Sequence, residues 1–116
     1  MYVDGFVAAV PNANKDQYVA YAKLAAEVFK ANGAIQVMEC WGDEVPDGKL
    51  TSFPMAVQKK DDETVVFSWI VWPDKAAHEK GFAAMMNDPR FDMKTNPMPF
   101  DGKRMIYGSF VPVLQA

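Results

Sequence analysis

The run VVFSWIVW at 65–72 constrains this fold most strongly, because both faces of the strand that it predicts are apolar. Successive side chains of a strand point to opposite faces, so the run forms two separate rows. One row is Val65, Phe67, Trp69 and Val71, and the other is Val66, Ile70 and Trp72. A strand with one face in water alternates apolar and polar residues instead. This strand therefore needs cover on both sides.

The first part of the chain predicts a strand, a helix and a second strand. Residues 2–10 are rich in β-branched and aromatic side chains, which is typical of strands. Apolar residues then recur at helical spacing from Tyr18 to Phe29, and this pattern predicts a helix that ends before Gly33. Residues 34–45 predict the second strand.

Polar residues mark where the two helices are expected to begin. Asn14 is followed three residues later by Gln17, which is the spacing of a capping box. Asp74 stands directly after a strand-like run and suits the N-cap of the second helix, which ends before Pro89.

The rest of the chain predicts two further strands and leaves one segment open. Residues 64–72 and about 103–113 are the two strands, joined through the second helix. The segment 52–58 is either a continuation strand or an edge strand, because Pro54 cannot donate a hydrogen bond within a sheet.

The element order is therefore β-α-β-β-α-β within one domain that spans residues 1–116. This order predicts an α+β, ferredoxin-like fold, in which right-handed crossovers place both helices on one face of an antiparallel sheet. The other face stays bare although its residues are apolar. We expect a second copy to cover it, which makes the protein a homodimer and a dimeric α+β barrel.

Composition excludes several classes of protein. The formal net charge is −3, and the densest basic cluster is only Lys103 with Arg104, which argues against nucleic acid as a partner. One cysteine, Cys40, cannot form an internal disulfide, and one histidine does not complete the usual zinc ligand sets.

Motifs for other compartments and cofactors are missing as well. No apolar run approaches the ~18 residues that span a bilayer, so we expect no contact with membranes. Met1 leads directly into strand-like sequence without the features of a signal peptide, which favours a cytoplasmic protein. The chain has no phosphate-binding glycine loop, dinucleotide fingerprint or metal-spaced cluster, so we expect no cofactor and no metal.

Four strings along the chain resemble a known bacterial family. They are YVDGF at 2–6, VPDGKLTSFP at 45–54, TVVFSWIVW at 64–72 and MPFDGKRMIYGSF at 98–110. Together they resemble domain of unknown function 1428, and the resemblance covers essentially the whole chain. It implies membership in the dimeric α+β barrel superfamily. That superfamily includes cofactor-independent monooxygenases, haem-degrading enzymes, lactone isomerases and binding proteins, so fold alone does not give this chain an activity.

Asp4 and Glu39 are the first candidates for acid–base catalysis. Asp4 lies in an otherwise apolar strand, where a buried carboxylate needs a partner. It is either a general base or ligand anchor, or a structural partner for Arg104 or Lys103 on the last strand, and we favour the structural role. Glu39 either faces solvent on an edge strand, which we favour, or lies in a pocket against Trp41 with a raised pKa.

His78, Arg104 and Tyr107 complete the catalytic candidates. His78 shares an apolar helical stripe and points toward the sheet or its rim, where a histidine is more often a packed core residue than a proton shuttle or a ligand. Arg104 can bind a carboxylate through two hydrogen bonds, and the Tyr107 hydroxyl needs a partner if it is buried. Strand alternation puts these last two on opposite faces.

Apolar side chains are the candidates for ligand binding. Strand aromatics are mostly core or dimer interface, although some line flat apolar sites. The candidates are Trp41, Phe67, Trp69 and Met85. The connection 89–101 is longer than most, so it is either a lid or a strap over the open end of the barrel or the dimer seam, and we favour the strap.

Three functions remain open from the sequence. The leading hypothesis is a homodimer that binds a small apolar or aromatic metabolite between helices and sheet. The alternatives are a cofactor-independent monooxygenase or isomerase, which requires two of the polar candidates to converge on one cavity, and an interaction protein without a pocket.

Overall fold

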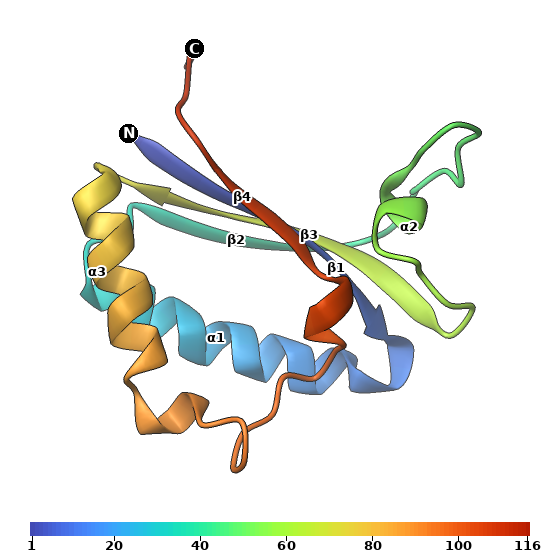
Figure 1. Ribbon diagram of the computed structural model, residues 1–116, viewed down its shortest axis with the longest axis horizontal. Helices are drawn as coiled ribbons and strands as arrows, with labels where there is room; N and C mark the ends of the chain where they lie inside the picture. The colour runs from blue at the N-terminus through green and yellow to red at the C-terminus, as the bar shows by residue number, and fades with distance from the viewer.

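A computed structural model describes residues 1–116 and contains one four-stranded antiparallel sheet with two long helices on one face (Figure 1). The main elements are β1 (Tyr2–Pro11), α1 (Lys15–Ala31), β2 (Gln36–Trp41), α2 (Phe53–Ala56), β3 (Glu63–Trp72), α3 (Lys75–Met86) and β4 (Ile106–Phe110). Short 3-10 helices span Asn12–Asn14, Pro89–Phe91 and Gly102–Arg104. The strand order is β2-β3-β1-β4, so the predicted ferredoxin-like α+β fold is confirmed.

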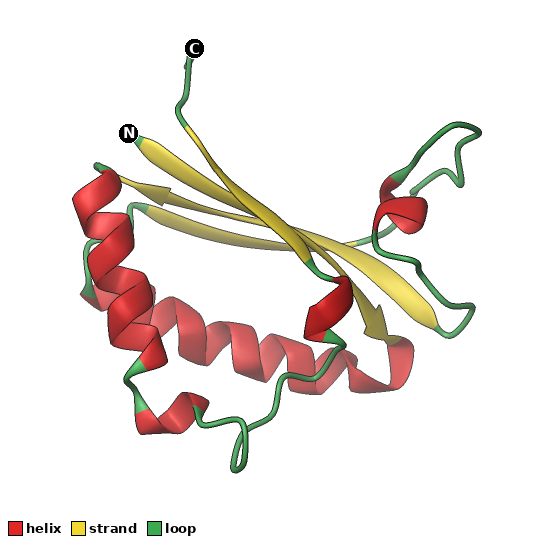
Figure 2. Cartoon of the chain, viewed as in Figure 1, coloured by secondary structure: helices red, strands yellow, loops and turns green.

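The two most apolar strands, β1 and β3, lie in the middle of the sheet, as their two-sided patterns require (Figure 2). Trp72 at the end of β3 has no solvent exposure and packs edge-on against Phe29 of α1, with ring centroids 5.8 Å apart. Phe82 of α3 contacts both rings. The two helices therefore share one core with the even-numbered residues of the central strands.

The opposite face of the sheet is apolar and largely uncovered. The short helix α2 and buried Val57 cover only one end of it, against Val7 and Val65. Large apolar side chains along the rest of this face keep between 37% and 61% of their surface exposed: Met38, Phe67, Ile106 and Phe110. One subunit therefore leaves this side of the sheet without cover, as the sequence predicted.

Helix boundaries follow local sequence signals, with one exception. Gly33 has φ +99°, the left-handed conformation expected just after a helix end. The Asp74 carboxylate accepts a hydrogen bond from the Ala77 backbone N–H, which confirms it as the N-cap of α3. The capping box at Asn14 is wrong, because its side chain makes no cap bond and instead donates to the Pro99 carbonyl.

Three strand predictions need correction. The segment 52–58 is not a strand: Ser52 caps the short helix α2, and Pro54 stands in its first turn, where a missing N–H costs nothing. The second strand is shorter than 34–45, and the last strand is shorter than 103–113. The first residues of the last predicted strand instead belong to the 3-10 helix Gly102–Arg104, which Asp101 caps.

Candidate functional site

The helix side of the sheet holds two adjoining cavities of different chemical character. One, which we call the polar cavity because Asp4, His78 and Ser109 are among its seven wall residues, has a volume of about 310 Å³ and lies between α3 and the β1–β4 pair. The other is apolar, has a volume of about 180 Å³ and lies under α1 and α3. The two share three wall residues, which are Phe6, Phe82 and Met105. These cavities supply the space that both pocket-based hypotheses require.

A buried carboxylate organises the polar cavity. Asp4 is 3% exposed and accepts three hydrogen bonds from side chains of three elements. Trp72 Nε1 and His78 Nδ1 both lie 2.7 Å from Asp4 Oδ2, and Ser109 Oγ donates to Oδ1 at 2.6 Å. An indole N–H only donates, so Asp4 Oδ2 accepts from Trp72, and an ionised Asp4 also accepts from His78, which requires the imidazole proton on Nδ1. The carboxylate thereby fixes the tautomer of His78.

His78 is held in place by rings as well as by Asp4. Its ring lies 5.1 Å from that of Tyr2 and 5.0 Å from that of Phe82, measured between centroids. Its side chain is 21% exposed and lines the polar cavity, and no protein group bonds Nε2. The second ring nitrogen is therefore available to a bound molecule.

Three of the five catalytic candidates converge on this cavity. Asp4 and His78 form the hydrogen-bonded pair, and Tyr107 lines the same space from β4. Tyr107 pairs with Phe6 across the β1–β4 ladder and stacks on its ring. Sequence reasoning identified each of these residues singly but not their contact.

The predicted pairing of Asp4 with Arg104 or Lys103 is wrong. Arg104 lies in the 3-10 turn before β4 and binds Glu63 through two hydrogen bonds, of 2.8 Å and 2.6 Å. It also binds Asp101 and the backbone of residues 57 and 58. This hydrogen-bonded ion pair lowers the pKa of Glu63 to about 2. Arg104 is therefore structural and lies outside both cavities. Because it precedes β4, the prediction that Arg104 and Tyr107 lie on opposite faces of one strand does not apply.

The apolar cavity contains one polar pair at its β2 side. The Tyr18 hydroxyl, on α1, donates a hydrogen bond to Glu39 Oε1. As a residue, Glu39 is exposed at the sheet edge, yet its carboxylate lies against this cavity. Burial raises the pKa of Glu39, and hydrogen bonds from Tyr18 and Ser68 partly offset that rise. Glu39 thus faces solvent at the sheet edge, as one prediction had it, while its carboxylate lies in a pocket and has a raised pKa, as the other had it.

Most predicted ligand-binding residues lie elsewhere. Met85 lines the apolar cavity. Trp41 packs against Tyr18 at the end of this core, with ring centroids 6.3 Å apart. Phe67 and Trp69 lie on the uncovered face, where their rings contact each other, so they do not line the helix-side cavities, and their role in ligand binding stays a prediction.

The connection 87–101 forms one wall of the apolar cavity. Met98 and Phe100 line the cavity, and Phe100 packs against Tyr18 at 5.9 Å between ring centroids. It covers the apolar cavity on the helix side of this subunit, as a lid would, and its role as a strap over the barrel end or the dimer seam stays a prediction.

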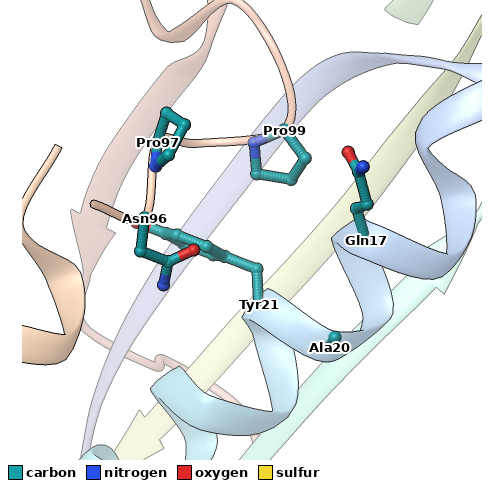
Figure 3. Close-up of a pocket in the computed structure, with 6 residues that line it drawn as sticks. All are labelled: Gln17, Ala20, Tyr21, Asn96, Pro97 and Pro99. Carbon is teal, nitrogen blue, oxygen red and sulfur yellow. The ribbon is translucent and has the colours of Figure 1, made fainter. Parts of the chain in front are cut away.

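An outer groove of about 400 Å³ runs between α1 and this connection (Figure 3). Gln17 and Tyr21 border it on the helix, and Asn96, Pro97 and Pro99 face them. The Tyr21 side chain therefore borders both the outer groove and the apolar cavity.

Sequence reasoning missed four site residues: Tyr18, Ser68, Trp72 and Ser109. Ser68 had a readable signal, because it is the one polar residue in an otherwise apolar run. It is 5% exposed and lies beside Glu39 in the cavity wall. The other three gain their roles only from contacts across the sheet and helices.

Two further features bear on function. No group of three or more His, Cys, Asp or Glu side chains is arranged to hold a metal ion. None of the helices has the length and apolar character required to cross a membrane.

Comparisons with known proteins agree with this fold. The profile of the family described as "Protein of unknown function (DUF1428)" matches residues 1–102. Proteins described as "Uncharacterized protein YbaA" from Escherichia coli K12 and Shigella flexneri are 51% identical over 113 residues, which covers 97% of both chains. Among solved structures, a dimeric ferredoxin-like protein from an uncultured marine organism superimposes with a TM-score of 0.61 at 11% identity. That match covers 99% of this chain and 97% of the other, and at this identity it supports the fold alone.

Proposed function

This chain belongs to the DUF1428 family, and we propose that it is a homodimer that binds one small aromatic metabolite per subunit in the apolar cavity. The observation that carries the proposal is the lining of this cavity, in which 14 of 16 residues are hydrophobic. Small-molecule sites typically combine such walls with a few placed polar groups. Here the polar groups are Glu39, Ser68 and the Tyr18 hydroxyl.

Size and polarity define the class of ligand. A cavity of about 180 Å³ suits a molecule with one ring, since an apolar protein cavity of about 150 Å³ binds benzene. Tyr18 and Ser68 are both placed at the Glu39 carboxylate, and since its two oxygens can accept about four hydrogen bonds, acceptor capacity remains for a ligand. A phenol fits this pattern, because its ring is apolar and its hydroxyl donates one hydrogen bond.

The homodimer follows from the uncovered face of the sheet. Monomeric proteins rarely expose a contiguous apolar patch of this kind unless it binds a partner. A second copy supplies a surface of the same shape and polarity, which is what a two-fold interface requires. The solved ferredoxin-like neighbour is described as dimeric, and the proposal assigns the same assembly to this chain.

The ligand proposal is tested with 4-methylphenol as the probe, by calorimetric titration of the full chain. We expect saturable binding with one site per subunit. Ala22→Leu places a larger side chain into the cavity and is expected to weaken binding by about tenfold or more. Ala31→Leu, at the exposed end of the same helix, is the matched control and is expected to bind as the unmodified chain does.

Two results would contradict the ligand proposal. One is the absence of binding up to the solubility limit of the phenol. The other is equal affinity in the Ala22→Leu and Ala31→Leu variants, which would place the bound phenol outside this cavity.

The dimer is tested by sedimentation equilibrium. We expect a dimer at micromolar concentration, and a monomer when Phe67→Asp places a charge on the uncovered face. Leu50→Asp changes a side chain that is already 99% exposed, and this control should remain dimeric. A monomeric unmodified chain would refute the assembly but not the cavity.

A further inference from the structure

The polar cavity has the parts of an acid–base site, and we infer that His78 is the general base of a proton-transfer reaction there. The inferred substrate is a small neutral ketone with an acidic C–H bond next to its carbonyl. This function goes beyond phenol binding and does not rest on it, because it uses a different cavity and different polar residues.

The first argument is the state of His78. Asp4 accepts the Nδ1–H at 2.7 Å, so Nε2 carries the lone pair of the neutral ring. Asp4 is itself held by Trp72 and Ser109, at 2.7 and 2.6 Å. A base oriented by a fixed carboxylate is the arrangement that general-base catalysis uses. Asp4 is therefore a positioning residue, and His78 is the group that meets the substrate.

The second argument is the hydroxyl across the cavity. Tyr107 and Ser109 project from the same face of β4, about 7 Å apart along the strand. Ser109 marks the position of the Asp4–His78 pair. Tyr107 thus borders the same cavity as the base, and the inference assigns its hydroxyl the hydrogen bond to the carbonyl oxygen of a substrate.

The lining of the cavity selects the substrate class. None of its seven residues is Lys or Arg, and its one carboxylate is already occupied by three donors. An anionic keto acid therefore finds no counter-ion here, whereas a neutral ketone does not need one. Phe6 and Phe82 supply aromatic walls, which favour an aryl group on the substrate.

The reaction balances without a cofactor. His78 Nε2 takes a proton from the carbon beside the carbonyl, and the C–H electron pair forms a C=C bond as the carbonyl π electrons move to oxygen. Tyr107 stabilises the resulting enolate by its hydrogen bond. The imidazolium then returns a proton to the same carbon or, in a conjugated substrate, to another one. The net change is hydrogen exchange or migration of a double bond, with no oxidation or reduction.

The test follows deuterium uptake by 2-tetralone, a neutral aryl ketone, in D₂O by proton NMR. We expect the unmodified chain to exchange the benzylic α-protons about 100-fold faster than imidazole at the same concentration. His78→Gln should abolish that excess, and Tyr107→Phe should reduce it by about tenfold or more. Glu79→Gln, the exposed neighbour of His78 on α3, is the matched control and should keep the full rate.

The role of Asp4 has a separate readout, because the chain has one histidine. Nitrogen NMR of His78 should show protonated Nδ1 and unprotonated Nε2 in the neutral ring, and Asp4→Ala, which removes the acceptor at Nδ1, should produce a mixture of tautomers. A merely structural Asp4 would leave the tautomer unchanged in the folded variant.

Defined results would overturn the inference. They are exchange no faster than with imidazole, exchange that survives His78→Gln, or a neutral His78 with its proton on Nε2. If His78→Gln does not fold, the exchange rate of Tyr107→Phe tests the inference, and an unchanged rate would overturn it. This tyrosine is 75% exposed, so removal of its hydroxyl leaves the core intact. Ala22→Leu should retain exchange, so failure of the phenol site and failure of this one are distinguishable.

Discussion

Asp4 and Glu63 are two buried carboxylates on the two central strands, and their exposed fractions are almost equal, at 3% and 5%. Their partners differ. Glu63 binds the Arg104 guanidinium with both oxygens and also accepts the Lys60 backbone N–H. Asp4 is surrounded by an indole, a hydroxyl and an imidazole, and it borders a cavity.

The difference teaches that burial alone does not decide what a carboxylate does. A guanidinium is always charged, so the partner of Glu63 keeps its charge and the ion pair stabilises the fold. An imidazole can gain and lose a proton, so Asp4 has a partner whose charge can change during a reaction. The predictions below test this contrast, from the largest expected change in stability to the smallest.

The largest effect is expected from Glu63→Gln. The amide NH₂ of glutamine would meet the N–H groups of Arg104, donor against donor, and leave a mostly buried cation poorly paired. We expect the free energy of unfolding to fall by about 3 kcal/mol, measured by urea denaturation at pH 7. Asp61→Asn, an exposed neighbour, is the control and should change it little. Equal stability of the two variants would remove the structural role of Glu63.

The same carboxylate predicts a pH dependence. The pKa of Glu63 is about 2 in the folded protein, against an ordinary value of 4.5. Its contribution is therefore complete above pH 4.5 and is lost as the pH falls toward 2. In urea titrations over that window, the stability difference between the unmodified chain and Glu63→Gln should shrink. A constant difference would mean that Glu63 titrates normally.

The next effect concerns Trp72, one of the donors to Asp4. Gly81 of α3 packs directly on its ring, and a Cβ at this position would lie 2.1 Å from the ring atom Cη2. Ala normally stabilises a helix by about 1 kcal/mol relative to Gly, but here we expect Gly81→Ala to destabilise by about 2 kcal/mol. Ala83→Gly, at an exposed site of the same helix, is the reference, because it changes stability through helix propensity alone. A more stable Gly81→Ala variant would show that Trp72 moves freely.

A smaller effect is expected from Asp4→Asn, in spite of its deeper burial. The asparagine oxygen can accept from Trp72 and His78, while its NH₂ donates to the Ser109 hydroxyl. All three partners stay bonded, so we expect a loss of about 1 kcal/mol in urea denaturation. A loss as large as that of Glu63→Gln would mean that the two carboxylates serve the same purpose.

The smallest effect is expected from Ser109→Ala. This residue is exposed, so water can replace its hydroxyl at Asp4 Oδ1. We expect a loss of about 0.5 kcal/mol by the same method, and an unchanged His78 tautomer by NMR. A changed tautomer would make Ser109 a part of the positioning of His78.

The fold could be predicted from the sequence because apolar periodicity is a local signal. The two-sided run 65–72 specified a central strand, and the stripe from Tyr18 to Phe29 specified the helix that covers it. Segment 52–58 failed, because its apolar residues suit a strand and its serine cap suits a helix, and tertiary contacts decided between them.

The site was less predictable because its residues meet only through register. Asp4 and Ser109 are paired across the β1–β4 ladder, and His78 reaches them from a helix. A shift of one residue in either strand would turn these side chains to the other face. The residue types alone therefore suggested Arg104 as the partner of Asp4, whereas the turn before β4 carries Arg104 to Glu63.

The apolar cavity has three methionines in its wall, Met85, Met98 and Met105. Thioether side chains are unbranched and rotate at low cost, so they follow the outline of whatever lies beside them. Such flexible walls let the cavity accept rings of different shape. Across a series of ring compounds, affinity should therefore depend more on the hydrogen-bonding group than on the shape of the ring.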